Sequence, residues 1–239
     1  MDRRTVGIGA VILVVGGMVA GVLLATLSTG ALPGASPTPT PGPAASAYTS
    51  QAFRPTTTVT VPGDWAVTVD QADAMTLSPL VTDGGASPVP TDVAGIYLFR
   101  DVRAAMQDPA CTTKPEAGVS SDARSLAGWV SSRPGLTATE PQAVTIGGLS
   151  GYEVEASIAP SWTSSCPFAN GAPSVSLLTN ESGTIRWVVF GTEKIRLAFL
   201  DVPGDGTVTV NTSATDGSIY PGLVNEVAPV IASMRFASQ

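Results

Sequence analysis

The chain has 239 residues and a formal net charge of −7 at pH 7. Hydrophobic residues make up 44% of the sequence, and this share excludes a wholly disordered chain. A negative surface repels phosphate backbones, so the charge argues against nucleic acid as a partner. An excess of acidic residues is also typical of a domain whose charged surface keeps it soluble. Histidine is absent, which excludes His-based catalytic triads and most zinc sites.

The N-terminal segment has the pattern of a membrane anchor. Arg3 and Arg4 precede an uncharged apolar run, residues 6–28, that is long enough to span a bilayer core of roughly 30 Å. Short basic flanks stay in the cytoplasm, so we expect residues 1–5 inside the cell and residues 29–239 outside it. The alternative is a cleaved signal peptide with a small-residue cleavage site at residues 28–30, although its apolar stretch normally has only about 7–15 residues. Both interpretations predict an exported domain.

Gly17 and Gly21 form a small-xxx-small pattern inside the predicted span. Such a pattern lets two membrane helices approach closely, so we expect weak dimerisation as one use of the anchor. The high glycine content of the segment is the alternative explanation of the pattern.

Residues 29–52 connect the predicted span to the remainder of the chain and are rich in Pro, Thr, Ser and Ala. A segment with almost no large apolar residue cannot collapse and tends to an extended, stiff conformation. The sequence therefore predicts a stalk that holds an exported domain, residues 53–239, away from the membrane.

From residue 53 onward the pattern changes to short β-branched and aromatic runs separated by Gly, Pro and Asp, which is typical of strands. Residues 57–61 and 65–69 alternate around Pro62, Gly63 and Asp64 and predict a hairpin. A second tight turn is expected at Gly147 and Gly148. Further strands are expected at residues 94–100, 143–146, 149–158, 175–179, 185–190, 196–202 and 207–211.

Two segments have helical periodicity instead. Ser121 is placed to cap the first helix, whose apolar stripe is Ala123, Leu126, Ala127 and Val130. The second helix is expected at residues 221–234, where Pro229 should kink or divide it. Its apolar face consists of Leu223, Val224, Val227 and Ile231. Many strands and two separated helices predict an α+β fold, an antiparallel sheet flanked by helices.

Cys111 and Cys166 are the two cysteines of the chain. In an exported chain an even number favours a disulfide, and two cysteines allow one intramolecular pairing. The bond would close a loop of about 55 residues, worth roughly 4 kcal/mol in the chain-entropy model. A free reactive thiol or a metal-binding pair is the alternative.

The sequence contains no recognisable catalytic arrangement. Residues 148–152 resemble a nucleophile elbow, but the closing glycine is missing and no histidine exists to activate Ser150. A phosphate-cradling loop and a Ser-x-x-Lys pair are also missing. We therefore expect no catalytic residue, no cofactor site and no metal site, and the chain is not predicted to be an enzyme.

Glu153 and Glu155 share one face of a predicted strand, opposite Tyr152, Val154 and Ala156. Such a pair could bind a cation or do acid–base work, and the alternative is the solvated face of a half-buried sheet. Trp162 follows Pro160 and Ser161 in a loop beside Cys166. We expect Trp162 to be an exposed residue that contacts a partner.

Five segments carry a resemblance to known sequences. They are residues 61–65 (Val-Pro-Gly-Asp-Trp), 108–111 (Asp-Pro-Ala-Cys), 144–152 (Val-Thr-Ile-Gly-Gly-Leu-Ser-Gly-Tyr), 196–201 and 231–236. In these motifs the chain resembles uncharacterised membrane-anchored or secreted bacterial proteins, chiefly actinobacterial. Some of those proteins are similar to the PsbP-type α/β/α sandwich, which binds partners and lacks catalysis. The resemblance implies such a sandwich here, and it carries over no functional residue.

These observations predict a non-catalytic binding or accessory module of the cell envelope. Its partner would be an envelope protein, a wall polymer or a small ligand. Two alternatives remain open. One is a carboxylate-dependent envelope enzyme that uses two acids, and the other is a structural stalked domain that dimerises through its anchor.

Overall fold

The computed structural model describes residues 44–81, 89–91, 93–108, 111 and 114–237. The predicted membrane span, residues 6–28, lies outside this part of the chain together with Gly17 and Gly21. Within the described residues, no helix combines the length and the apolar character that crossing a membrane requires. The anchor and its dimerisation therefore stay predictions.

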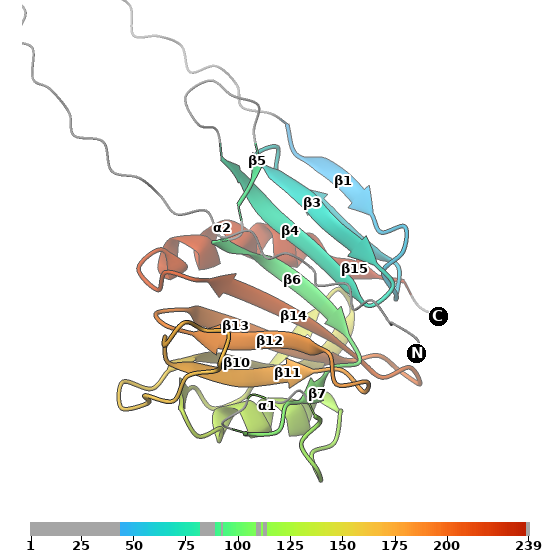
Figure 1. Cartoon of the computed structure of the whole chain (residues 1–239). Coiled ribbons are helices and arrows are strands. Elements are labelled where there is room, and N and C mark those ends of the chain that lie inside the picture. Colours follow the sequence, from blue (N-terminus) through green and yellow to red (C-terminus); the bar gives the residue numbers. More distant parts are fainter. Residues whose placement is uncertain (1–43, 82–88, 92, 109–110, 112–113, 238–239) are drawn as a thin grey trace, which may run out of the picture. The chain divides into compact units, whose positions relative to one another are not determined.

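An antiparallel sheet of nine strands is the centre of the described part of the chain (Figure 1). Its main path runs β3-β4-β6-β14-β13-β10-β8, while β5 pairs with β4 and β9 pairs with β10. The bounds of these strands are β3 Trp65–Gln71, β4 Ala74–Val81, β5 Val89–Pro90, β6 Ala94–Arg100, β8 Leu136–Ala138, β9 Gln142–Ile146, β10 Leu149–Ile158, β13 Lys194–Asp201 and β14 Thr207–Ala214.

Strand β14 lies in the middle of this sheet, and all eight of its residues are buried. Successive side chains of a strand point to opposite faces, so a strand of this kind needs cover on both faces. Val208 and Val210 of β14 belong to one hydrophobic core, whereas Leu197 and Phe199 of β13 belong to a second core. The sheet therefore separates two cores.

The first core is covered by helix α2, Tyr220–Ser233, and by a small three-stranded sheet. The small sheet has the order β1-β2-β15, and its strands are β1 Ser46–Thr49, β2 Thr57–Val61 and β15 Arg235–Phe236. Leu223 and Val227 of α2 pack in this core together with Val59 and Val61 of β2.

The second core is covered by helix α1, Ala123–Ser131, and by another three-stranded sheet of order β12-β11-β7. Its strands are β7 Arg103–Ala104, β11 Ser174–Thr179 and β12 Ile185–Phe190. Because α1 packs in the second core and α2 in the first, the two helices lie on opposite faces of the large sheet, as Figure 1 shows. The fold is α+β, with a mostly antiparallel sheet and two helices in the described part.

Helix α1 buries the predicted stripe, because Ala123, Leu126, Ala127 and Val130 are its buried residues. The predicted cap is wrong by one position. Asp122, and not Ser121, is the N-cap residue, and its side chain accepts a hydrogen bond from the N–H of Ser125. Both residue types satisfy the free N–H groups of a first turn, so spacing alone does not separate them.

Helix α2 is one continuous element of 14 residues that includes Pro229, so this proline does not divide it, and the kink stays a prediction. A proline removes one helical hydrogen bond and crowds the preceding turn. The helix nevertheless continues, because it buries Leu223, Val227 and Val230 in the first core on either side of the proline.

The predicted hairpin of residues 57–61 and 65–69 is also wrong. β2 pairs with β1 and β15 of the small sheet, whereas β3 pairs with β4 of the large sheet. The turn at Pro62 connects the small sheet to the large sheet. In this turn the carbonyl of Pro62 accepts a hydrogen bond of 3.0 Å from the N–H of Trp65. Alternation predicts each strand, but the partner of a strand depends on packing against distant residues.

The folded chain begins before residue 53, because β1 lies within residues 29–52, which the sequence assigns to the stalk. Asp70 fixes the segment after β1. It accepts hydrogen bonds from the hydroxyl of Tyr48 and from the backbone N–H groups of Gln51, Ala52 and Phe53. Burial alone would raise the pKa of Asp70, but these four hydrogen bonds outweigh burial and lower the pKa below 3.8.

Glu193 is a buried carboxylate between β12 and β13, with 1% of its surface exposed. It accepts three hydrogen bonds, from Nε1 of Trp187 at 3.1 Å, from the N–H of Phe190 at 3.1 Å and from Oγ of Ser213 at 2.6 Å. Burial raises the pKa of Glu193 to about 7 in spite of these bonds. The charge of this group therefore changes near neutral pH.

We predict that Glu193 makes the stability of the protein depend on pH. The folded pKa lies above the ordinary value of 4.5, so the stabilisation is complete below 4.5 and is lost as the pH rises through about 7. The free energy of unfolding should fall by about 3 kcal/mol over this interval. Urea unfolding at several pH values measures it. Glu193→Gln should flatten the profile, whereas the exposed control Glu181→Gln should keep it, and an unchanged slope in Glu193→Gln would contradict the assignment.

Candidate functional site

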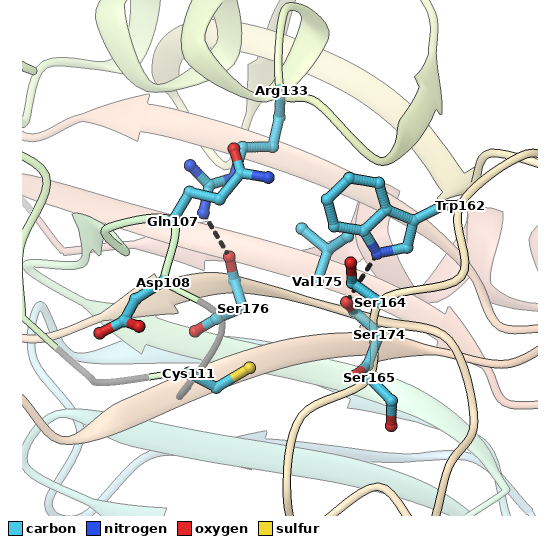
Figure 2. Close-up of a pocket in the computed structure, with 10 residues that line it drawn as sticks. All are labelled: Gln107, Asp108, Cys111, Arg133, Trp162, Ser164, Ser165, Ser174, Val175 and Ser176. Carbon is cyan, nitrogen blue, oxygen red and sulfur yellow. Dashed lines mark hydrogen bonds between the residues drawn. The ribbon is translucent and has the colours of Figure 1, made fainter.

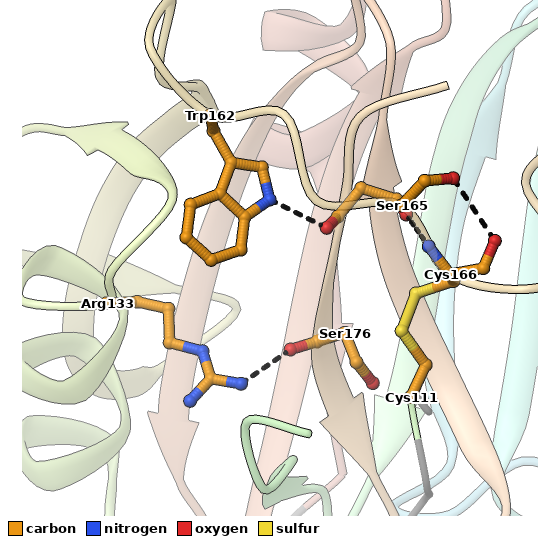
Figure 3. Close-up of a disulfide and its surroundings, with 7 residues drawn as sticks. Cys111, Arg133, Trp162, Ser165, Cys166 and Ser176 are labelled. Carbon is orange, nitrogen blue, oxygen red and sulfur yellow. Dashed lines mark hydrogen bonds between the residues drawn. A yellow bond between two sulfur atoms is a disulfide. The ribbon is translucent and has the colours of Figure 1, made fainter. Parts of the chain in front are cut away.

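The structure brings the three residues singled out by the sequence, Cys111, Cys166 and Trp162, to one place. Cys111 and Cys166 form a disulfide with an S–S distance of 2.02 Å, so the predicted pairing is confirmed. Figure 3 shows the bond beside Ser176 of β11, with Arg133 and Trp162 nearby.

The disulfide joins two irregular segments that come from different parts of the fold. Cys111 follows β7, and its N–H donates to the carbonyl of Asp108 at 2.8 Å. Cys166 precedes β11 and is 1% exposed, and its N–H donates to Oγ of Ser174 at 2.6 Å. The bond therefore ties both segments to the start of β11.

A small cavity of about 80 Å³ opens next to the disulfide (Figure 2). Its walls come from the segment after β7, the end of α1, the loop before β11 and β11 itself. The lining residues are Gln107, Asp108, Cys111, Arg133, Trp162, Ser164, Ser165, Ser174, Val175 and Ser176.

Arg133 is the basic side chain of this cavity, which it enters from the end of α1, and only 5% of its surface is exposed. Its Nη2 donates to the carbonyl of Ser176 at 3.1 Å, and its guanidinium lies 4.5 Å from the centre of the Trp129 ring. The nearest carboxylate is that of Glu116, with Oε2 at 3.8 Å from Nη1. Burial, opposed by Glu116, lowers the pKa of Arg133, but a guanidinium remains charged at any physiological pH.

Two polar atoms of the cavity walls have no hydrogen-bond partner in the described part of the chain, Nε of Arg133 and Oγ of Ser176. Buried polar groups of folded proteins are nearly always paired, and an unpaired one costs about 1–3 kcal/mol. Asp108 also lines the cavity, but Figure 2 shows its carboxylate pointing away from the guanidinium. The cavity is therefore lined by a positively charged residue, and Arg133 and Ser176 each keep one buried atom with an unmet hydrogen bond.

Trp162 forms another wall of the cavity and is half-buried, not fully exposed as the sequence suggested. Its Nε1 donates to the carbonyl of Ser174 at 3.0 Å. The indole packs on Gly135, where an added Cβ would lie 2.7 Å from the ring. Gly135 has a φ of +89°, so both its conformation and its close contact with Trp162 require glycine. A contact between Trp162 and a partner stays a prediction.

Glu153 and Glu155 share one face of β10, as predicted, but an arginine bridges them. Arg196 of β13 donates from Nε to Oε1 of Glu155 at 2.9 Å, and its Nε lies 3.6 Å from Oε1 of Glu153. The Tyr220 hydroxyl donates to the same Glu155 oxygen at 3.2 Å. Burial raises the pKa of Glu153. Both carboxylates are half-buried and lie beside shallow hollows, so the face is less solvated than its strand position indicated.

Arg133 and Ser176 carry no signal in the sequence that marks them as site residues. Arg133 stands before Pro134 and Gly135, so it reads as the exposed end of a helix. Ser176 lies in a strand whose six residues are all buried. No local pattern marks either residue, because the cavity arises from four segments that are distant in sequence. Among the described residues, no group of three or more Cys, Asp or Glu side chains is placed to hold a metal ion.

Comparison with known proteins shows structural likenesses. No protein-family model matches the chain, and no curated protein matches it. The chain is similar to LpqN, described as involved in cell envelope biogenesis of Mycobacterium tuberculosis, with 14% identity and a TM-score of 0.40, over 80% of this chain and 90% of that chain. It is similar to cyanobacterial PsbP (CyanoP) of Synechocystis, with 11% identity and a TM-score of 0.38, over 85% of this chain and 98% of that chain.

A third similar structure is a protein of Bacteroides thetaiotaomicron, with 12% identity and a TM-score of 0.31, over 77% of this chain and 46% of that chain. At these identities and TM-scores, the likenesses carry no statement about function.

We predict that removing the disulfide lowers the free energy of unfolding by about 4 kcal/mol, because the bond closes a loop with a sequence separation of 55. The double variant Cys111→Ala/Cys166→Ala tests this in urea unfolding. Wild-type protein in reductant should match the variant. A loss well under about 1 kcal/mol would show that contacts alone hold the two segments in place.

Proposed function

We propose that the chain is a non-catalytic binding module of the cell envelope, exported and held at the membrane by residues 6–28. The observation that carries the proposal is the cavity beside the disulfide, where the buried Arg133 keeps an unpaired N–H next to an unpaired hydroxyl of Ser176. Groups of this kind recognise an oxygen acceptor, and a carboxylate or a phosphate suits the positive charge best.

The size of the cavity indicates what kind of partner it receives. Pockets that enclose a whole small molecule have volumes of roughly 300–1,000 Å³. A cavity of about 80 Å³ accommodates one group of carboxylate or phosphate size. The partner is therefore a larger molecule, an envelope protein or polymer, that inserts one acidic group between Arg133 and Trp162.

The proposal predicts that acetate and inorganic phosphate, as minimal probes, bind at the cavity. The indole N–H of Trp162 lies at the cavity wall and reports occupancy in nuclear magnetic resonance spectra of the full-length chain. Its signal should shift saturably with acetate or phosphate and not with chloride at equal ionic strength. Arg133→Gln should weaken binding by about tenfold or more, the value of a charge-assisted hydrogen bond.

A second variant guards against loss of folding. Ser176→Ala removes an unpaired buried hydroxyl, so it should leave the stability unchanged or improved and weaken the probes several-fold. Arg54→Gln is the control, because this exposed arginine lies outside the cavity. If neither probe produces a saturable shift in the folded wild-type chain, the proposal fails.

A carboxylate-dependent envelope enzyme is the second candidate. It is favoured by Glu153, a half-buried acid with a raised pKa beside a hollow, with Glu155 on the same face. The full-length chain would then release fragments from purified peptidoglycan, and Glu153→Gln would abolish the release while Glu181→Gln, at an exposed acid outside this hollow, would not. No release by the wild-type chain removes this candidate.

A further inference from the structure

The outer edge of β9 is an open strand edge. β9 is paired with β10, and within the described part of the chain no strand pairs with its other side. β9 joins β10 through a two-residue turn, Gly147 and Gly148, both with positive φ. In such a hairpin Ile146 and Leu149 are a hydrogen-bonded pair, and the pattern alternates from there. The N–H and C=O groups of Ala143 and Thr145 therefore point outward.

The centre of this edge has none of the features that prevent edge pairing. Ala143 and Thr145 are small, exposed and uncharged, and Val144 between them is half-buried. Natural edges are usually protected by lysine, proline, a bulge or covering chain. The opposite edge strand, β3, is covered in this way, since Asp70 holds the backbone of residues 51–53 against it. Proline occurs beside β9 only at Pro141, outside the strand.

Hollows lie on both faces of the β9–β10 hairpin. One hollow, of about 550 Å³, lies between the hairpin and Asp201, with Tyr152 in its wall. The other, of about 470 Å³, lies between the hairpin and α2. Val144 and Thr145 contribute to both hollows.

Unpaired charges stand at the two ends of the edge and have opposite signs. Glu140, just before β9, is exposed and has no ion pair among the described residues. Arg235 lies at the other end, beside the turn, where the N–H of Phe236 donates to the carbonyl of Gly147 at 3.2 Å. Arg235 is exposed and donates to two backbone carbonyls, and no carboxylate of the described part pairs with it.

We propose that β9 is an interface between two copies of this chain, which pair antiparallel about a two-fold axis at Val144. Ala143 of one copy then lies opposite Thr145 of the other, and the outward N–H and C=O groups of both pairs are satisfied. The same register sets Glu140 against the turn of the second copy, next to that copy's Arg235. The two-fold axis therefore creates two pairs of opposite charge, each between Glu140 of one copy and Arg235 of the other. An arbitrary peptide strand would need a matching basic and acidic end, whereas a second copy supplies both.

Cysteine crosslinking of the full-length chain in an exporting host tests the interface. In the proposed register the two copies of Val144 form a non-hydrogen-bonded pair, whose Cα atoms lie about 4.5 Å apart, within the range of a disulfide. Val144→Cys should therefore give a covalent dimer on a non-reducing gel. Ser182→Cys, in an exposed turn away from β9, is the matched control and should stay monomeric.

Two further changes separate this interface from other modes of dimerisation. Thr145→Pro removes an outward N–H without breaking a bond to β10, so in the Val144→Cys background it should lower the crosslinked fraction by about tenfold. Glu140→Arg or Arg235→Glu alone should lower the crosslinked fraction, and the two together should restore it. The dimer should survive Gly17→Leu/Gly21→Leu, which removes the predicted contact between anchors.

Two outcomes overturn the proposal. One is a Val144→Cys chain with an intact Cys111–Cys166 bond that crosslinks no more than Ser182→Cys. The other is crosslinking that Thr145→Pro leaves unchanged in a folded chain.

Discussion

The burial of β14 on both of its faces is the constraint on which the rest of the structure depends. An antiparallel sheet commonly exposes one face to water, and then one layer of cover is enough. Here the eight residues of β14 are all buried, so the chain must supply two layers. It does so with one helix and one three-stranded sheet on each face. This requirement explains why the long chain of strands is divided among three sheets, and why neighbours in sequence such as β2 and β3 belong to different ones.

The cover of the second core creates the candidate site. Helix α1 has nine residues, and the sheet beside it includes β7, which has two residues. Elements this short leave irregular chain between them, and the Cys111–Cys166 bond holds that chain in place. Arg133 enters from the end of α1 because the helix stops at Ser131 and the turn at Gly135 is fixed under Trp162. The cavity thus forms where irregular segments connect short helices and strands. Its lining is polar because the backbone N–H and C=O groups of such segments need hydrogen-bond partners.

Features with a local cause could be predicted from the sequence, and features with a non-local cause could not. The stripe of α1, most strands, the turn at Gly147 and the pairing of Cys111 with Cys166 each depend on a few adjacent residues or on a pairing that has one solution. Strand β4, Ala74–Val81, has no clear strand pattern over its whole length, because Pro79 interrupts the alternation that begins at Met75. The partners of β2, the burial of Arg133 and the bridge from Arg196 to Glu155 depend on segments far apart in sequence, and no local pattern encodes them.

Glu193 and Arg133 are the two most deeply buried charged side chains of the described residues, and they differ in whether the protein alone can satisfy their charge. Glu193 and Arg133 are 1% and 5% exposed. Glu193 has a donor for each oxygen and a pKa near neutrality, so the protein can neutralise it by protonation and needs no ligand. Arg133 has no such option, because a guanidinium does not lose its proton, and its nearest carboxylate is 3.8 Å away. An unpaired buried donor on a permanently charged group destabilises the folded chain when no partner is bound. A partner that supplies the missing acceptor would remove this cost, and the free energy regained would appear as affinity for that partner.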